Sequence, residues 1–285
     1  MSTYAAQLRN ELTACAVHYA QQNRIQFRRS HYESGSVVFF PTADQTAHGN
    51  FHPASYRAIM RRAIWRKRLG KVLTVTDRLH DMEDDRRLCE LDSCCSSDAL
   101  LMNIFSHPQV RSSSRVLGML GLHDSAVPIF GWRARVPLMD GKFDRTEVDM
   151  KFSHLLVEAK LTEGSFECCT MERMQSYTDF RQVFRLSELH HSRRQYRCYQ
   201  LLRNVLAAHA HNASFCLITD ARRIDLTDAW FEVLAAIRPL DLRVRCKLLT
   251  WQELAETLPG SLREFLNQKY GVGASVDASR LPVGY

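Results

Sequence analysis

The stretch that decides the fold is Thr146–Glu163, TEVDMKFSHLLVEAKLTE. Two runs rich in apolar and β-branched residues flank Ser153 and His154, a spacing typical of a tight β-hairpin. A two-residue turn fixes the register of such a hairpin, so Asp149 is expected about opposite Glu158. The stretch therefore predicts two adjacent strands, each of which carries one carboxylate.

Lys160 completes this pattern. Residues two apart in a strand share a face, so Glu158 and Lys160 are expected to project to the same side of the sheet. Two carboxylates beside an ammonium group form a compact site for a hard divalent cation and an attacking water. Magnesium prefers oxygen ligands, so Asp149 and Glu158 predict Mg²⁺ (or Mn²⁺) rather than a metal held by histidines. This arrangement indicates a metal-dependent nuclease.

Composition sets the broad class. The chain has 285 residues, of which 45% are hydrophobic, and this is enough for one large domain or a domain with an extension. Its net charge of +7 favours polyanionic partners, namely DNA, RNA or anionic lipid. The N-terminal sequence does not resemble a signal peptide, and no apolar window is long enough to span a membrane. We expect a cytoplasmic protein without a membrane partner.

The nine cysteines form no CxxC pair, which indicates reduced thiols that are mostly buried. A zinc site built from Cys89, Cys94 and Cys95 is conceivable. No matching His or Cys pair follows at finger-like spacing, so small buried hydrophobic side chains are the favoured interpretation.

The densest basic run, RAIMRRAIWRKRLGK at residues 57–71, contains seven basic residues and no acid. It predicts a surface that contacts nucleic-acid phosphates, through Arg61, Arg62, Arg66, Lys67 and Arg68. The alternative is a solvated helix face, onto which the acidic stretch at residues 81–87 folds back.

Other N-terminal segments are interpreted structurally. Residues 4–24 predict a helix, on which Glu11 is a surface carboxylate or, less favoured, a metal ligand. His48 and His52 have HxxxH spacing, but the nearby Gly and Pro indicate a loop with two polar histidines. The run that begins at Ser96 predicts a capped helix.

Strands and helices alternate after the hairpin, which favours an α/β layer structure. A helix over residues 193–209 is expected to have an apolar face and a polar face, and the polar face carries Arg193, Arg197, Gln200 and Asn204. We expect Arg193 and Arg197 to contact nucleic acid. Strands are predicted at residues 214–219 and 243–250, and a helix with a capping box follows the second strand.

These residues resemble the PD-(D/E)XK nuclease superfamily, which has the restriction-endonuclease-like fold. More narrowly, the chain resembles a bacterial family of restriction-endonuclease-like proteins in four sequence blocks: HGNF at 48–51, SSDALLMNIF at 96–105, VEAKLTE at 157–163 and YQLLRN at 199–204. The resemblance implies an α/β fold with an αβββαβ core, a mixed central sheet flanked by helices, and an N-terminal, largely helical extension. The expected divisions are an N-terminal helical region with the basic patch packed on the core (1–115), the nuclease core (116–268) and a C-terminal tail (269–285).

The resemblance also assigns roles to residues. It implies that Asp149 and Glu158 hold the metal ion, and that Lys160 orients or activates the attacking water and stabilises the charge that develops on the phosphate. Gln200 resembles the glutamine that many members carry on the helix after the core strands. Two positions depart from the pattern, because Val148 replaces a proline and Asn204 replaces a tyrosine.

The expected activity is endonucleolytic hydrolysis of phosphodiester bonds in DNA. The resemblance also allows a homodimer, because many restriction-like nucleases pair to cut both strands. An alternative is a nucleic-acid-binding or defence-associated protein of the same fold with little or no cleavage activity. A further alternative makes Glu158 and Lys160 a surface salt bridge without catalysis. Glu163 is either a further carboxylate of the metal site or an exposed acid.

Overall fold

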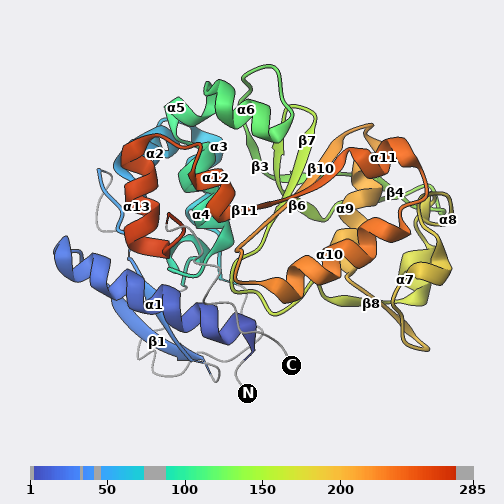
Figure 1. Cartoon of the computed structure of the whole chain (residues 1–285), viewed down its shortest axis with the longest axis horizontal. Helices are drawn as coiled ribbons and strands as arrows, with labels where there is room; N and C mark the ends of the chain where they lie inside the picture. The colour runs from blue at the N-terminus through green and yellow to red at the C-terminus, as the bar shows by residue number, and fades with distance from the viewer. Residues whose placement is uncertain (1–2, 33–34, 42–45, 74–87, 274–285) are drawn as a thin grey trace. The chain divides into compact units, whose positions relative to one another are not determined.

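The computed structural model describes residues 3–32, 35–41, 46–73 and 88–273, and these form two compact units (Figure 1). The first unit is built from the described residues within 1–119, 220–222 and 250–285. The second unit comprises residues 120–219 and 223–249. The predicted division at residues 115 and 268 stays a prediction. The two units are defined by contacts alone, and this definition does not test which segments fold or act independently.

The second unit is organised around a five-stranded mixed sheet with the strand order β11-β10-β7-β6-β3. β3 and β7 each pair with β6 in antiparallel orientation, and β7 pairs with β10 in parallel. The strands are β3 (Ile129–Arg133), β6 (Glu147–Phe152), β7 (Leu155–Ala159), β10 (Ser214–Thr219) and β11 (Cys246–Thr250). The predicted mixed sheet flanked by helices is confirmed.

The β6–β7 hairpin has the predicted register. Met150 pairs with Val157 and Phe152 with Leu155 across the turn, where Ser153 adopts a φ of 57°. Along β6, buried residues alternate with half-buried ones, and Asp149 is among the half-buried ones. The pairing places Asp149 and Glu158 on the same face of the sheet, because paired residues project to the same side.

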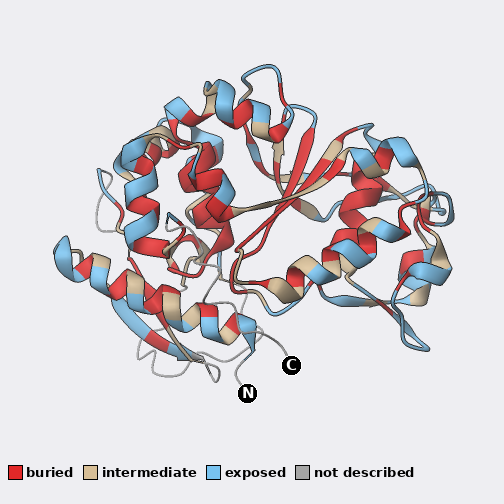
Figure 2. Cartoon of the chain, viewed as in Figure 1, coloured by how far each residue is buried: buried red, intermediate tan, exposed pale blue. Residues whose placement is uncertain are grey.

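β7 lies in the middle of the sheet, and all five of its residues are buried. Figure 2 shows the central strands as largely buried. The face that carries Glu158 also carries Leu156 and, on β10, Phe215 and Leu217. Apolar residues of helix α9 (Tyr199–Ala210) join these side chains in one core, through Leu201, Leu202, Val205 and Leu206. This packing sets the distance between α9 and the carboxylates of the hairpin.

Helix α9 begins six residues later than the sequence predicted. Cys198 has a left-handed conformation, with a φ of 59°, which prevents the helix from extending toward residue 193. The preceding residues form β9 (Gln195–Arg197), which pairs with β8 (Cys168–Thr170) in a separate two-stranded antiparallel sheet. Two main-chain bonds fix the start of α9, from Tyr199 N to the carbonyl of Glu167 and from Gln200 N to that of Phe166, both 3.1 Å long.

The predicted strand over residues 243–250 is also too long at its start. Helix α11 (Leu240–Val244) occupies the first part, and β11 begins at Cys246. Pro239 suits the start of a helix, and the Arg243 side chain donates to the carbonyl of Ile237 over 2.9 Å, which stabilises the turn. The predicted capping box between Thr250 and Glu253 is confirmed.

The remaining elements of the second unit are short. They are β4 (Val136–Pro137), β5 (Phe143–Asp144), α7 (Met171–Gln175), α8 (Phe180–Val183), the 3₁₀ turn Leu186–Glu188 and the longer helix α10 (Ile224–Ala236). Asp144 in β5 is 5% exposed, and it accepts hydrogen bonds from Thr146 N (2.8 Å), Arg173 Nη2 (2.9 Å) and the Tyr177 hydroxyl. Burial of this carboxyl raises its pKa, but the bonds from Thr146 and Tyr177 outweigh burial and hold the pKa at about 2.

Replacement of Asp144 by asparagine is expected to lower the free energy of unfolding by about 1.5–3 kcal/mol at neutral pH, because hydrogen bonds to a charged group are lost. The folded-state pKa lies below the ordinary value of 3.8, so ionised Asp144 stabilises the fold above that pH. This contribution is lost as the pH falls toward about 2. Urea denaturation at decreasing pH should therefore show the difference between wild type and variant shrinking below the ordinary pKa. A pH-independent difference would contradict this account.

The first unit is mainly helical, with one small hairpin. Its elements are α1 (Tyr4–Gln22), β1 (Arg28–Tyr32), β2 (Gly35–Phe39), α2 (Pro53–Met60), α3 (Ala63–Arg68), the 3₁₀ turn Glu90–Asp92, α4 (Ser97–Phe105), α5 (Pro108–Arg111), α6 (Ser114–Leu120), α12 (Trp251–Ala255) and α13 (Gly260–Tyr270). All nine residues of α4 are buried, and Ser96 caps the helix by accepting from Ala99 N over 3.1 Å, as predicted. In the described part of the chain, no helix combines the length and apolarity required to cross a membrane.

Three expectations concern the rest of the chain. Helix α1 confirms the predicted N-terminal helix. The acidic stretch at 81–87 lies outside the described residues. Of the predicted tail 269–285, the first two residues end helix α13, and residues 274–285 lie outside the described range.

Candidate active site

Asp149 lies where β6 and β7 stop pairing through their main chains. Its Oδ2 accepts a hydrogen bond of 2.8 Å from Ala159 N, so a side-chain carboxylate satisfies an amide of β7. The last main-chain pair before this point joins Met150 and Val157. The bond holds the Asp149 carboxylate at the end of β7, against Ala159, the residue that follows Glu158 in the chain.

Glu158 and Lys160 form a buried ion pair. The two residues are 3% and 6% exposed, and Lys160 Nζ lies 3.1 Å from Glu158 Oε1. A bond of 2.8 Å from Lys160 N to the carbonyl of Ile218 continues the parallel pairing past the end of β7, which keeps both side chains on one face. The alternative placed this salt bridge on the surface, and that placement is wrong because both side chains are buried.

The Lys160 ammonium lies in the field of several carboxylates. Burial lowers the pKa of this group, but Glu158, Glu163 and Asp149 act against burial and raise the pKa above its ordinary value. The side chain is therefore positively charged at neutral pH. A charged lysine at this position places a positive charge beside the carboxylates.

The segment after β7 is held by bonds on both sides of Leu161. Glu163 Oε2 accepts from Leu161 N over 2.6 Å, and Arg223 Nη1 donates to the Leu161 carbonyl over 2.9 Å. Arg223 is fully buried and pairs with Asp225 over 2.8 Å. Glu163 is half-buried and bound to the main chain, so it acts on the site through its charge on Lys160.

Helix α9 supplies an amide to this site. Asn204 is fully buried, and its Nδ2 donates to Glu158 Oε2 over 2.7 Å. Gln200 lies one helical turn earlier on the same strip of α9. Its Oε1 is buried without a hydrogen-bond partner among the described residues, so this oxygen is not bonded to any residue of the site. The sequence placed Asn204 on the polar face of this helix and as a departure from a motif, and Asn204 is the α9 residue bonded to Glu158.

The donors at this site fit a hard divalent cation. Asp149 and Glu158 supply carboxylate oxygens, and a carboxylate has about four lone-pair sites to share between hydrogen bonds and a metal ion. The buried, unpartnered Oδ1 of Asn204 adds a neutral oxygen acceptor. Within the described residues, no group of three or more His, Cys, Asp or Glu side chains is arranged to hold a metal ion. Two carboxylates alone would leave most positions around a cation such as Mg²⁺ to water, which this ion retains readily.

The basic residues expected to contact nucleic acid fall into different environments. Arg61, Arg62, Arg66 and Lys67 are exposed on or beside α3. Arg68 differs, because its Nη2 pairs with the buried Asp98 over 2.9 Å. Arg68 therefore has a buried ion-pair partner within the first unit. Two of its neighbours have weaker contacts, because Arg62 lies over the Trp65 ring and Arg66 Nη1 donates to the Met60 carbonyl over 3.4 Å.

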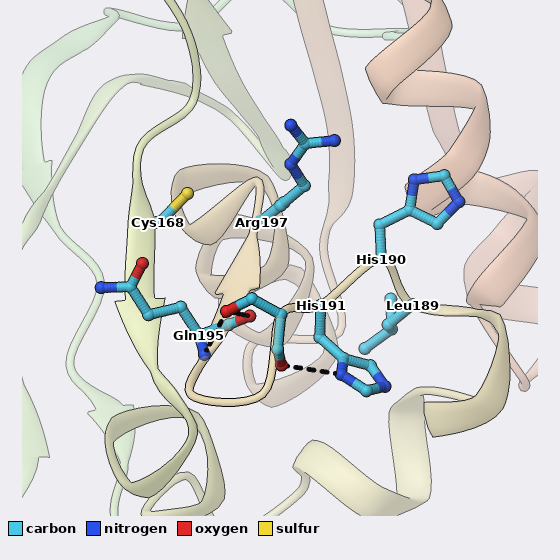
Figure 3. Close-up of a pocket in the computed structure, with 7 residues that line it drawn as sticks. Cys168, Leu189, His190, His191, Gln195 and Arg197 are labelled. Carbon is cyan, nitrogen blue, oxygen red and sulfur yellow. Dashed lines mark hydrogen bonds between the residues drawn. The ribbon is translucent and has the colours of Figure 1, made fainter.

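Arg197 ends β9 and Arg193 lies in the turn before this strand, so neither residue is on α9, contrary to the helix predicted from the sequence. Arg197 lines a pocket of about 500 Å³ together with Cys168, Leu189, His190, His191, Ser192 and Gln195 (Figure 3). His190 Nδ1 lies 3.0 Å from Glu232 Oε2 on α10. The exposed residues around Arg193 and Arg197 present a basic surface, but these two arginines do not share a helix face with Gln200.

The remaining candidates have structural contacts. Glu11 accepts from Arg222 Nη1 over 2.9 Å. His48 Nε2 lies 3.0 Å from Asp92 Oδ1, and His52 caps helix α2. The thiols span the full range of exposure: Cys94, Cys95, Cys216 and Cys246 are buried, Cys168 is exposed, and the other four are half-buried.

A mixed sheet flanked by helices, with an acidic hairpin and a lysine at its centre, defines a protein of the restriction-endonuclease-like fold. A family model described as "Restriction Endonuclease associating with ARP" matches residues 16–271, and the chain belongs to this family. The predicted relationship to restriction-endonuclease-like proteins is thus confirmed, and the family indicates a nuclease. Comparison with curated proteins and with solved structures gives no match.

Proposed function

We propose that the protein is a metal-dependent endonuclease that hydrolyses phosphodiester bonds of DNA. The observation that carries this proposal is the buried pair of Glu158 and Lys160, 3.1 Å apart, on the strand whose end holds the Asp149 carboxylate. Burial of two charged groups beside a third, half-buried carboxylate is costly unless they serve a function. Family membership supports the same class of activity.

Each residue has a chemical role in this proposal. Asp149 and Glu158 would hold Mg²⁺ or Mn²⁺, which supplies charge neutralisation at the phosphate and an activated water when bound. Lys160 is positively charged, so it stabilises the negative charge that develops on the phosphate oxygens. Asn204 and Lys160 each bind one oxygen of Glu158, which fixes the orientation of this carboxylate.

The test is incubation of the purified protein with supercoiled plasmid and with single-stranded DNA, in Mg²⁺, in Mn²⁺ and in EDTA. We expect cleavage in either metal and none in EDTA. Lys160→Ala should reduce the cleavage rate by about 10²–10³-fold, the loss typical of removing one group that stabilises the transition state. Undiminished cleavage by this variant would remove the active-site assignment. If no condition gives cleavage while DNA is still bound, the protein is a nucleic-acid-binding member of the fold.

The exposed basic residues of α2 and α3 support a role for the first unit in binding DNA. The described residues of the segment 53–68 contain no acid, so their charges are not neutralised within these two helices. We expect a variant with Arg61, Arg66 and Lys67 all changed to alanine to bind DNA more weakly. The slope of log affinity against log salt concentration should decrease by ~0.9 for each phosphate that the variant no longer neutralises.

A charge-matched control separates this surface from general electrostatics. Arg28, Arg29 and Arg263 are also exposed in the first unit, and their replacement by alanine removes the same net charge. This control should retain most of the DNA affinity and its salt slope. Equal losses in both triple variants would show that net charge alone determines binding.

The proposed function also implies partners. Many restriction-like nucleases pair to cut both strands, so we propose a homodimer, which sedimentation with and without DNA would test. The family description names association with ARP, and we extend this partner to the chain as a proposal.

A further inference from the structure

Asn204 has two polar atoms in different situations. Its Nδ2 donates to Glu158 Oε2 over 2.7 Å, whereas its Oδ1 is buried and has no hydrogen-bond partner in the described structure. The residue is fully buried, so solvent at the surface does not satisfy this oxygen. An unpaired buried acceptor is costly, which indicates that it has a partner in the working protein.

Two other orphan oxygens occur near this position. Gln200 Oε1, one turn earlier on α9, is buried without a partner, and so is Thr219 Oγ1 at the end of β10. Leu217 pairs with Glu158, so Thr219 follows on the same face of the sheet, beside Lys160. These three unpaired oxygens lie on α9, which contacts Glu158, and on β10, which pairs with its strand. They suggest bound water next to the carboxylates.

We propose that Asn204 is a positioning residue of the metal site: its Nδ2 orients Glu158, and its Oδ1 accepts a hydrogen bond from a water on the metal ion. This inference rests on the proposed function. An amide oxygen is only an acceptor, and a metal-bound water is a strong donor, so the two match. Magnesium retains several of its waters in proteins, and these need acceptors in the surrounding protein.

The test is calorimetric titration of the nucleic-acid-free protein with Mn²⁺, which does not depend on catalysis. Asn204→Leu fills a similar volume without polar atoms, and it should raise the dissociation constant by ~10–100-fold, the usual effect of removing a partner of a metal ligand. Asn204→Ala leaves space for a water that can bond to Glu158, so its loss of affinity should be smaller. Thermal unfolding of each variant reports whether it is folded.

A matched control is Val205→Ala on the same helix. Val205 is equally buried but packs in the apolar core, so this variant should lower the melting temperature and leave Mn²⁺ affinity unchanged. If Val205→Ala weakens Mn²⁺ binding as much as Asn204→Leu does, Asn204 acts only through the packing of α9 and the inference is wrong. Unchanged affinity in Asn204→Leu also overturns it.

Cleavage assays separate this inference from the proposed function. Wild-type protein that binds no Mn²⁺ and cleaves no DNA would refute the proposed function, and the inference with it. Wild-type protein that binds Mn²⁺ and cleaves DNA, combined with normal Mn²⁺ affinity in Asn204→Leu, would refute the inference alone. The supporting result is a higher Mn²⁺ concentration for half-maximal cleavage in Asn204→Leu, with the rate largely recovered at saturating metal.

Discussion

Replacing Glu158 with alanine is expected to lower the free energy of unfolding by about 3–5 kcal/mol and to abolish cleavage. The variant leaves the Lys160 ammonium, whose side chain is 7% exposed, without the carboxylate that lies 3.1 Å away. An uncompensated buried charge is strongly destabilising. Glu163 and Asp149 also act on this ammonium, which places the expected loss at the lower end of the range. Chemical denaturation and the plasmid assay measure the two effects.

The double variant Glu158→Ala with Lys160→Met identifies the cause. It removes both charges, so the stability should return close to that of the wild type, because an apolar replacement of a buried ion pair is often neutral or stabilising. Cleavage should remain absent. A single variant as stable as the wild type would mean that the ammonium is solvated or paired elsewhere, contrary to the buried pair in the structure.

Replacing Asp149 with asparagine is expected to reduce cleavage by about 10³-fold with little change in stability. In the wild type, Ala159 N donates to Asp149 Oδ2 over 2.8 Å, and the amide oxygen of asparagine can still accept this bond. The end of the hairpin should therefore keep its structure. The negative charge is lost, and a catalytic metal contributes several kcal/mol. Each ~1.4 kcal/mol corresponds to a tenfold change in rate.

Asp149→Ala serves as the comparison for this experiment. It removes the acceptor as well as the charge, so it should lose stability in addition to activity, by about 1–3 kcal/mol for the unpaired amide. Measurements of the cleavage rate, Mn²⁺ affinity and melting temperature distinguish the two variants. Full activity in Asp149→Asn would exclude this carboxylate as a metal ligand.

The central hairpin could be predicted from the sequence because its information is local. A two-residue turn between two apolar runs fixes the register, and the register brings Asp149 and Glu158 to one face. Lys160 follows from strand periodicity alone. The residues that complete the site come from elsewhere in the chain: Asn204 is 46 residues from Glu158 and Arg223 is 62 residues from Leu161. Such contacts depend on the packing of α9 and α10, which periodicity does not specify.

The wrong start predicted for α9 has a local cause, whereas the partner of Arg68 is distant in the sequence. The start of α9 depends on Cys198 in a left-handed conformation, which is uncommon for a residue other than glycine, asparagine or aspartate. Arg68 belongs to a basic run, but its partner Asp98 is 30 residues away on α4. A charge run by itself does not show which of its members are neutralised in the fold.

The anchoring of α9 has a consequence for how this family can diversify. Its first two amides are bonded to the main-chain carbonyls of Glu167 and Phe166, and these bonds involve no side chain. Substitutions at the exposed residues 192–194, which precede β9, are therefore expected to leave the position of Asn204 relative to Glu158 unchanged. Under the proposed function, the arginines of this exposed turn can be changed to alter contacts with DNA while Asn204 and Glu158 keep their positions.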